Sequence, residues 1–231
     1  MMQRQDTLAH NLANVSTPGF RAELQAFRAV PVQGSGASTR VYALESTPGY
    51  DASPGPVTAT GRNLDVAVKG NAWLAVQGLD GTEAYTRNGS LEVSANGVLQ
   101  TRDGKPVLGD GGPVTIPPDN EITIGADGSI SAAQPGQPGV VNVVAQLKLV
   151  NPPEAGLVRG DDGLFRVQGG APAAADPGVR VAGGYLEGSN VNVVDQMVQM
   201  ISLARQFEMQ TRMLSTAEQN DRAAAQVLGQ G

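Results

Sequence analysis

The sequence contains no cysteine and a single histidine, His10, in 231 residues. Without cysteine the chain forms no disulfide, no thiolate metal site and no cysteine nucleophile, and one histidine does not make a multi-histidine metal cluster. Aromatic residues are scarce, with four Tyr, four Phe and one Trp, and sugar-cleaving sites need a carboxylate pair beside aromatic rings. We therefore predict a protein that is not an enzyme, with no catalytic residues, no cofactor and no metal.

Two further absences concern nucleic acids and membranes. Lys and Arg number 16 against 22 Asp and Glu, a net charge of −6, so a basic surface for nucleic acid is not expected. No apolar run approaches the roughly 18 residues that a membrane span needs, so we predict no membrane insertion. The N-terminus also lacks the apolar segment of a signal peptide. Specialised export systems, however, use uncleaved N-terminal segments.

The N-terminal residues predict a short helix. Residues 1–15 contain no glycine or proline, and Leu8, Leu12 and Val15 follow one another at steps of four and three, a helical stripe. Pro18 and Gly19 then follow, so the helix should end near Val15. A helix of that length is marginal alone in water and needs a packing partner.

The middle of the chain predicts β structure. Residues 34–62 are rich in Gly, Ser, Thr and Pro, which indicates an extended linker with one short strand near residues 40–44. Residues 63–187 alternate apolar and polar side chains between Asp-Gly and Asn-Gly dipeptides. Such dipeptides favour tight turns, so we expect a central antiparallel β domain of many short strands.

The C-terminal residues predict a long helix. No glycine or proline occurs from residue 189 to residue 228, and 40 helical residues span about 60 Å. Steps of three and four select a largely apolar seam, Met197, Met200, Ala204, Phe207, Thr211, Leu214, Glu218, Asp221, Ala225 and Leu228. The N-terminal helix is too short to cover this seam, and an uncovered apolar surface usually marks an interaction site.

The predicted fold class is therefore mixed and mainly β. A central antiparallel β domain of short strands lies between N- and C-terminal helices in the sequence, and these two helices pair with each other as a coiled coil. We expect a discontinuous helical domain at residues 1–33 and 188–231. The linker is residues 34–62, and the β-rich domain is residues 63–187.

Three segments carry a resemblance to a known family. Residues 11–21 (NLANVSTPGFR), 60–73 (TGRNLDVAVKGNAW) and 184–192 (GYLEGSNVN) resemble signatures of the bacterial flagellar rod and hook family. Residues 147–150 (LKLV), 159–165 (RGDDGLF) and 205–210 (RQFEMQ) are similar to its proximal-rod members, with distal-rod and hook members as the alternatives. The N-terminal family motif consists of Asn11, Leu12, Ala13, Asn14, Val15, Ser16, Thr17, Pro18, Gly19 and Phe20.

The resemblance implies a structural subunit of the proximal rod, the drive shaft for motility, in a head-to-tail helical polymer. Its partners would be other rod subunits, further copies of itself, the flagellar export apparatus and chaperone-type factors. It would reside in the basal body, spanning the periplasm, after type III export without a cleaved signal peptide. Terminal helices would form the inner tube, with the β domain outside. The expected assembly interface consists of Leu8, Leu12, Val15, Met197, Met200, Ala204, Phe207, Leu214 and Leu228.

Two expectations complete the sequence-based picture. Family members carry a dozen or more residues ahead of the point where this sequence starts, so either the sequence is truncated at its start or the N-terminal helix is shorter here. The alternative from another class is a β-rich carbohydrate-binding or hydrolytic protein with an oligomerisation helix, and glycan binding without assembly would favour it.

Overall fold

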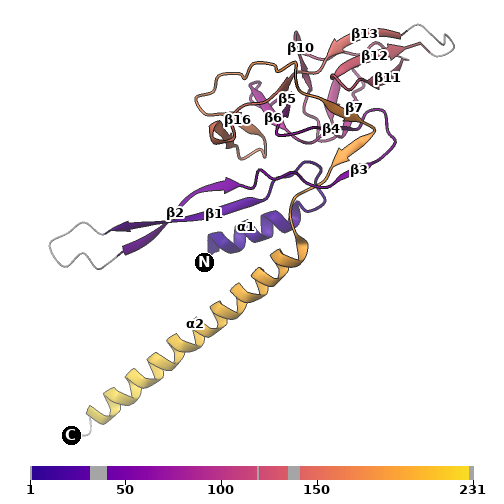
Figure 1. Ribbon diagram of the computed structural model, residues 1–231. Helices are drawn as coiled ribbons and strands as arrows, with labels where there is room; N and C mark the ends of the chain where they lie inside the picture. Colours follow the sequence, from indigo (N-terminus) through magenta and orange to yellow (C-terminus); the bar gives the residue numbers. More distant parts are fainter. Residues whose placement is uncertain (1, 32–40, 119, 135–140, 229–231) are drawn as a thin grey trace. The chain divides into compact units, whose positions relative to one another are not determined.

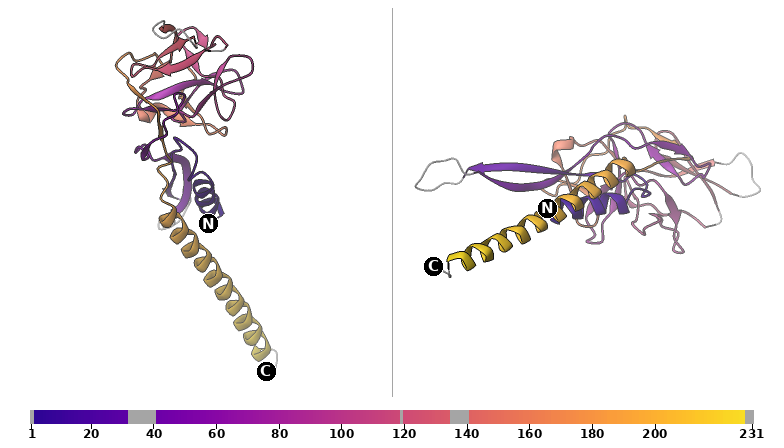
Figure 2. Two further views of the ribbon diagram at one scale, coloured as in Figure 1. Left: turned by 90° about the vertical axis from the view of Figure 1, so that its right-hand side faces the viewer. Right: turned by 90° about the horizontal axis from the view of Figure 1, so that it is seen from below.

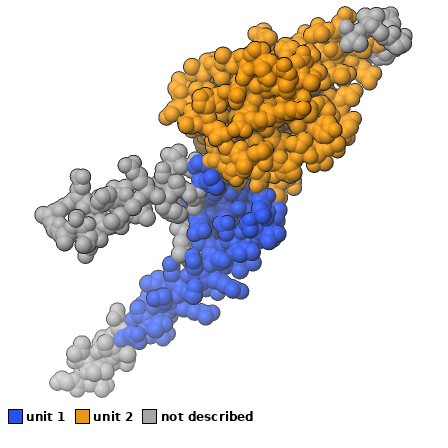
Figure 3. Space-filling view, viewed as in Figure 1, with its two compact units in different colours: residues 1–13, 23–49, 191–231 blue, residues 14–22, 50–190 orange. Residues whose placement is uncertain are grey.

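A computed structural model describes residues 2–31, 41–118, 120–134 and 141–228 (Figure 1). The chain divides into two compact units, distinguished by colour in Figure 3. The helical unit comprises residues 1–13, 23–49 and 191–231, and the β unit comprises residues 14–22 and 50–190. Both units are therefore assembled from segments that lie far apart in the sequence.

The helical unit contains two helices of unequal length and a two-stranded ribbon. Helix α1 spans Met2–Ala13 and helix α2 spans Val193–Leu228. The two helices run side by side in opposite directions, as the views of Figures 1 and 2 both show. Strands β1 (Glu23–Pro31) and β2 (Val41–Tyr50) form the ribbon.

The helix ends follow from local chemistry. The Asn192 side-chain oxygen accepts hydrogen bonds from the Val194 and Asp195 amides at 3.0 and 3.3 Å, which satisfies two free donors of the first turn of α2. Helix α1 ends at Ala13, two residues before the position predicted from Pro18. The short strand predicted near residues 40–44 is the start of β2, which runs on to Tyr50, whereas β1 lies in the expected helical segment and was not predicted.

The β unit is built from short antiparallel strands, as predicted. Its largest sheet has the order β14 (Leu149–Val150), β5 (Trp73–Gln77), β6 (Glu83–Thr86), β16 (Phe165–Val167) and β15 (Leu157–Arg159). A second sheet joins β11 (Glu121–Ile124), β12 (Ser129–Ala133) and β13 (Val141–Gln146).

Two-stranded pairs and one helical turn complete the β unit. The pairs are β3 (Val57–Ala59) with β18 (Tyr185–Glu187), β4 (Val66–Val68) with β17 (Val181–Gly183), β7 (Leu91–Val93) with β8 (Leu99–Thr101), and β9 (Leu108–Gly109) with β10 (Gly112–Pro113). A 3-10 turn spans Glu154–Gly156. Residues 141–150 are divided between β13 and β14 and do not form one continuous strand.

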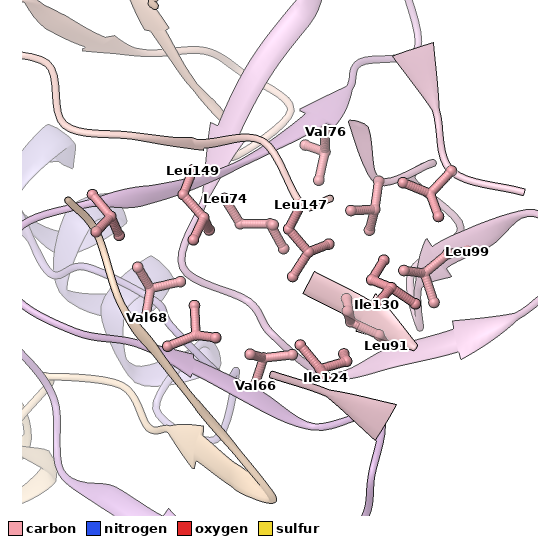
Figure 4. Packing of buried hydrophobic residues seen from close by; sticks show 14 of the residues in the cluster. Val66, Val68, Leu74, Val76, Leu91, Leu99, Ile124, Ile130, Leu147 and Leu149 are labelled. Atoms are coloured by element: carbon pink, nitrogen blue, oxygen red, sulfur yellow. The ribbon is translucent and has the colours of Figure 1, made fainter. Parts of the chain in front are cut away.

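The β unit has an aliphatic core and an aromatic one. Aliphatic side chains from many strands meet in the first, including Val66, Leu74, Leu91, Leu99 and Ile130 (Figure 4). The second contains Trp73, whose ring centroid lies 4.5 Å from that of Phe165 and 6.3 Å from that of Tyr50. Trp73 is therefore a core residue of the β unit.

Five Asx-Gly dipeptides form the same five-residue turn. The amide of the first residue donates to the carbonyl of the fifth, and the glycine amide donates back to the carbonyl of the first. The glycine has φ between 76° and 85° in all five turns, a conformation that disfavours other residues. This is a hairpin loop closed by a glycine bulge, and it occurs at residues 78–82, 94–98, 101–105, 125–129 and 160–164.

Two other dipeptides do not form this turn. Gly89 has no positive φ, and a Cβ placed on it would lie 1.7 Å from the Val66 carbonyl oxygen. Glycine is needed there because its backbone approaches that of strand β4 closely. Gly111 also lacks a positive φ, but a Cβ at this position would meet nothing within 4 Å. Asp-Gly and Asn-Gly dipeptides therefore occur in this chain both with a positive glycine φ in tight turns and without one elsewhere.

These contrasting environments give a matched pair of variants. Gly89→Ala should lower the free energy of unfolding by about 1–3 kcal/mol or more, because the backbone of Val66 must move to admit the methyl group. Gly111→Ala should change it by less than about 0.5 kcal/mol. Urea unfolding followed by Trp73 fluorescence measures both, and equal effects would contradict the close approach at Gly89.

One turn carries a charge that makes stability depend on pH. Both guanidinium Nη atoms of Arg166 donate to the Asp162 carboxylate, at 3.0 and 2.8 Å. These hydrogen bonds lower the pKa of Asp162 below its ordinary value of 3.8. The charged form is therefore favoured by folding, and its contribution to stability is present above pH 4 and is lost as pH falls through the lowered pKa.

Asp162→Asn should reduce the free energy of unfolding at pH 7 by about 1 kcal/mol, since Asn lacks the charge that pairs with Arg166. At pH 2 the variant and the natural chain should approach each other in stability, because Asp162 is then largely protonated. Asp161→Asn, at the neighbouring exposed position, is the control and should be nearly silent. A deficit of equal size at both pH values would show that the charge is not its source.

Candidate assembly interface

Helix α1 packs against the first turns of α2. Leu8 on α1 is 5% exposed and Leu203 on α2 is 7% exposed, and they are the most deeply buried apolar side chains described on the two helices. Leu12 is half-buried further along α1. Burial of these leucines supplies the packing that a helix as short as α1 needs.

The covered side of α2 differs by one position from the predicted seam. Gln196 and Met200 are half-buried and Leu203 is buried, whereas Met197 and Ala204 are exposed. Steps of four and three from Gln196 keep these residues within about 60° of one another on the helix. The seam was predicted from regular steps starting at Met197, and that starting point missed Leu203.

The same side of α2 continues beyond the reach of α1. Phe207 and Leu214 prolong the series from Leu203 at steps of four and seven, and they are 63% and 68% exposed. Helix α1 has 12 residues and α2 has 36, lengths of about 18 and 54 Å. We call Phe207 and Leu214 the distal stripe. The side chain of Leu228, also predicted to be at the interface, lies outside the described residues.

Asn11 of the family motif anchors the start of β1. Its side chain is buried and donates to the Glu23 carbonyl at 3.1 Å, while its side-chain oxygen accepts from the Glu23 amide at 2.8 Å. This pairing mimics that of two β-strands. The imidazole Nδ1 of His10 lies 3.0 Å from the Glu23 carboxylate. The only histidine is therefore a structural contact within the helical unit.

The later motif residues belong to the β unit. Gly19 has φ of 68°, and a Cβ on it would lie 2.2 Å from the carbonyl carbon of Arg87, so only glycine fits. Phe20 is buried beneath the guanidinium of Arg159, which lies 4.5 Å from the ring centroid. Val15 is half-buried. It was predicted as an assembly residue but lies in the β unit.

A buried ionic cluster holds the two ends of the β unit together. Glu187 is 1% exposed, and it lies between Arg21 and Arg87, each 3% exposed. Arg87 Nε donates to one Glu187 carboxylate oxygen at 2.8 Å, and Arg21 Nη1 lies 2.7 Å from the other. The cluster therefore connects the segment after the family motif to strand β18 by charge.

The two arginines are satisfied to different degrees. Arg87 also donates to the carbonyls of Val68, Gly70 and Ala72. Burial lowers the pKa of Arg87, although the nearby Glu187 charge acts in the opposite direction. Arg21 Nη1 forms an ion pair with the Glu187 carboxylate, but the angles of this contact are not those of a hydrogen bond. Arg21 Nε has no hydrogen-bond partner among the described residues. Glu187 is thus the acidic counter-charge of both.

Asn190 joins three backbone segments of the β unit beside this cluster. Its side-chain oxygen accepts from the Ala22 amide at 2.7 Å, and its side-chain nitrogen donates to the carbonyls of Asp51 and Ser53 at 3.0 and 2.9 Å. The Asp51 amide in turn donates to the Ala22 carbonyl at 2.8 Å. The segments that lead out of the β unit toward α1, β1, β2 and α2 are therefore cross-linked by hydrogen bonds.

Arg21 and Glu187 lie within the family segments 11–21 and 184–192, and no role was predicted for either charged residue. Their signal is weak, because Arg21, Arg87 and Glu187 are far apart in sequence and only folding brings them together.

The described residues contain no group of three His, Asp or Glu side chains placed to hold a metal ion. A hollow of about 340 Å³ is lined in part by Glu83, Asp110 and Lys148, but Glu83 and Lys148 are paired with each other at 2.7 Å. No described helix has the length and apolar character to cross a membrane.

The ionic cluster generates a stability prediction. Glu187→Gln keeps the shape of the side chain but leaves two buried arginines without their counter-charge, so it should cost about 3–5 kcal/mol. Urea unfolding monitored by Trp73 fluorescence reports on the β unit, and Glu121→Gln at an exposed position is the control. A loss below 1 kcal/mol would show that the cluster does not hold the unit together.

Comparison with known proteins follows the same three parts of the chain. Residues 2–21 match the family description "Flagella basal body rod protein", residues 67–132 match "Flagellar hook protein FlgE/F/G D1 domain", and residues 182–227 match "Flagellar basal body rod FlgEFG protein C-terminal". The first and third contain α1 and most of α2, and the second falls within the β unit.

Individual relatives match over almost the whole length. The chain is 49% identical to the flagellar basal-body rod protein FlgF of Salmonella typhimurium and 50% identical to FlgF of Escherichia coli, in both cases over 98% of this chain and 93% of the relative. It is 32% identical to the rod protein FlgG of Buchnera aphidicola over 93% of this chain and 90% of that protein. The chain therefore belongs to the flagellar basal-body rod family of FlgE, FlgF and FlgG proteins.

Proposed function

We propose that this chain builds the flagellar rod by packing its terminal helices against those of neighbouring subunits. It is a structural subunit of the proximal rod and not an enzyme, in line with the FlgF proteins that it matches at 49–50% identity. The single observation that carries the proposed mode of assembly is the apolar side of α2, which α1 covers at Leu203 and leaves open at Phe207 and Leu214.

The free energy gained by burying apolar side chains favours assembled subunits over the isolated chain. Burying one large apolar side chain contributes about 1.5–3 kcal/mol, and Phe207 and Leu214 are both mostly exposed in the single chain. In a polymer the same gain recurs at every subunit. The two side chains of the distal stripe can therefore stabilise a long polymer even if two free subunits do not form a tight dimer in solution.

The wider setting follows from the same proposal. The partners are further copies of the chain and other rod subunits, and the terminal helices form the inner part of the rod with the β-rich residues outside. Delivery through the flagellar export apparatus, with chaperone-type factors and no cleaved signal peptide, would place the chain in the basal body across the periplasm. The absence of cysteine is compatible with that route.

The alternatives are less well supported. FlgG relatives are 32–33% identical, against 49–50% for the two FlgF relatives from enteric bacteria, so a distal-rod role is disfavoured. A carbohydrate-binding or hydrolytic role has no specific observation in its favour. The one tryptophan, which such a site would use for stacking, is 3% exposed.

Phe207→Asp tests the assembly mode. Because Phe207 is 63% exposed in the single chain, the change should alter the stability of the purified protein by less than about 0.5 kcal/mol. In the rod the same position would be buried, where loss of the ring costs about 3–5 kcal/mol and the charge adds a desolvation penalty. Thermal melting and swimming of complemented cells are the two measurements.

The expected result is a protein that melts normally and is exported, in cells that do not swim. Glu208→Ala alters the next residue, about 100° around the helix from Phe207, and should leave swimming intact. Normal swimming with Phe207→Asp would show that the distal stripe is not a rod contact.

A further inference from the structure

The final residues of the β unit, 176–190, complete sheets that begin at its start. They contain strands β17 and β18, which pair with β4 and β3. The first and last parts of the unit are therefore joined strand to strand. We call residues 176–190 the closing segment, because they come last in the β unit along the chain.

Backbone hydrogen bonds connect the closing segment to earlier parts of the unit. As it advances from residue 176 to residue 188, its partners move back from residue 149 to residue 56. The bonds run from the amides of Asp176, Val181, Gly184 and Gly188 to the carbonyls of Leu149, Ala126, Asp65 and Pro56, at 2.8, 2.9, 2.8 and 2.8 Å. One short segment therefore supplies hydrogen-bond donors along much of the unit.

The closing segment also fills part of the aliphatic core. Val179 and Val181 are 8% and 1% exposed, and they belong to the same cluster of buried side chains as Val66 and Leu74. Without the closing segment this cluster would lose two of its members. Strand β4, which pairs with β17, would also lose its partner strand and the cover over its buried valines.

The buried charges of the unit depend on the same segment. Glu187, at the end of β18, is the acidic counter-charge of Arg21 and Arg87. Its carboxylate also accepts a hydrogen bond from the Gly55 amide at 3.0 Å. A buried charge that lacks its partner is strongly unfavourable. The unit without its closing segment would therefore have to bury two arginines without their shared carboxylate.

We infer that residues 14–22 and 50–175 reach their folded arrangement only when the closing segment joins them. The β unit then folds as one cooperative unit, and its last strands complete it. Because a chain is synthesised from its N-terminus, most of the unit is made before the closing segment is available. The fold thus contains a delay, which keeps the chain unfolded until residues beyond 175 have been made.

This delay suits a chain that must be threaded through a channel. A chain that is still unfolded when its N-terminal part has emerged can be captured by an export apparatus before it folds. That consequence rests on the proposed function, whereas the order of folding does not.

Amide hydrogen exchange of the free, full-length chain tests the inference. The amides of Val181 and Gly184 in the closing segment are compared with those of Ala75 and Gln77 in strand β5, all of which are hydrogen-bonded. We expect the protection factors of the two sets to lie within about tenfold of each other, because both sets are exposed only when the whole unit unfolds. A larger difference, in either direction, would show that the two parts open independently and would overturn the inference.

A matched pair of variants sharpens this test. Val181→Ala, at a buried position, should speed exchange of both sets of amides by the same factor, about tenfold or more. Val143→Ala, at a position that is 68% exposed, should change neither set. If Val181→Ala sped exchange in the closing segment alone, strand β5 would be stable without that segment, contrary to the inference.

Chains arrested on the ribosome test the order of folding. One arrested chain ends at residue 175, as the growing chain does before the closing segment is made, and the other ends at residue 231. Each is followed by the same flexible Gly/Ser linker, which places it outside the exit tunnel. Limited proteolysis should digest the first chain and leave a protected β unit in the second.

A protected β fragment from the chain that ends at residue 175 would overturn the inference. So would full digestion of the chain that ends at residue 231, because the closing segment would then not complete the unit. Neither experiment involves rod assembly or swimming. Failure of this inference therefore leaves the proposed function standing, and loss of the proposed function would leave these measurements unchanged.

Discussion

The packing of α1 against the first turns of α2 is the interaction that stabilises the short N-terminal helix. With 12 residues, α1 covers the first turns of α2, and the 36 residues of α2 extend far beyond it. Leu203 is buried, while Phe207 and Leu214 on the same side remain open. A long helix of this kind is stable in water only if another surface packs along it. The side of α2 beyond Leu203 is the surface that we propose neighbouring subunits cover.

The β unit binds the segments of the chain that lead to the two helices. Glu187 neutralises charge from Arg21 and Arg87 in a site closed to water, and Asn190 binds the backbone at Ala22, Asp51 and Ser53. Buried ion pairs contribute little net stability compared with apolar packing, but they specify one arrangement, because removing one partner is costly. We interpret this cluster as the feature that fixes where the terminal segments leave the unit.

Regular local patterns were predictable from sequence, and contacts between distant segments were not. Both helices and the turns at residues 78–82 and 125–129 follow from the placing of glycine and proline and from apolar spacing. The seam on α2 was placed one residue away, because steps of three and four fit both Ala204 and Leu203 until a partner selects between them. Arg21, Arg87 and Glu187 gave no local signal, since their roles depend on three segments meeting in the folded unit.

The central claim is that α2 is incomplete until subunits assemble. Amide hydrogen exchange along α2, compared between the free chain and isolated basal bodies, tests this most directly. The account predicts rapid exchange after residue 207 in the free chain and strong protection of the same residues in the assembled rod. Equal exchange of these residues in both states would contradict it.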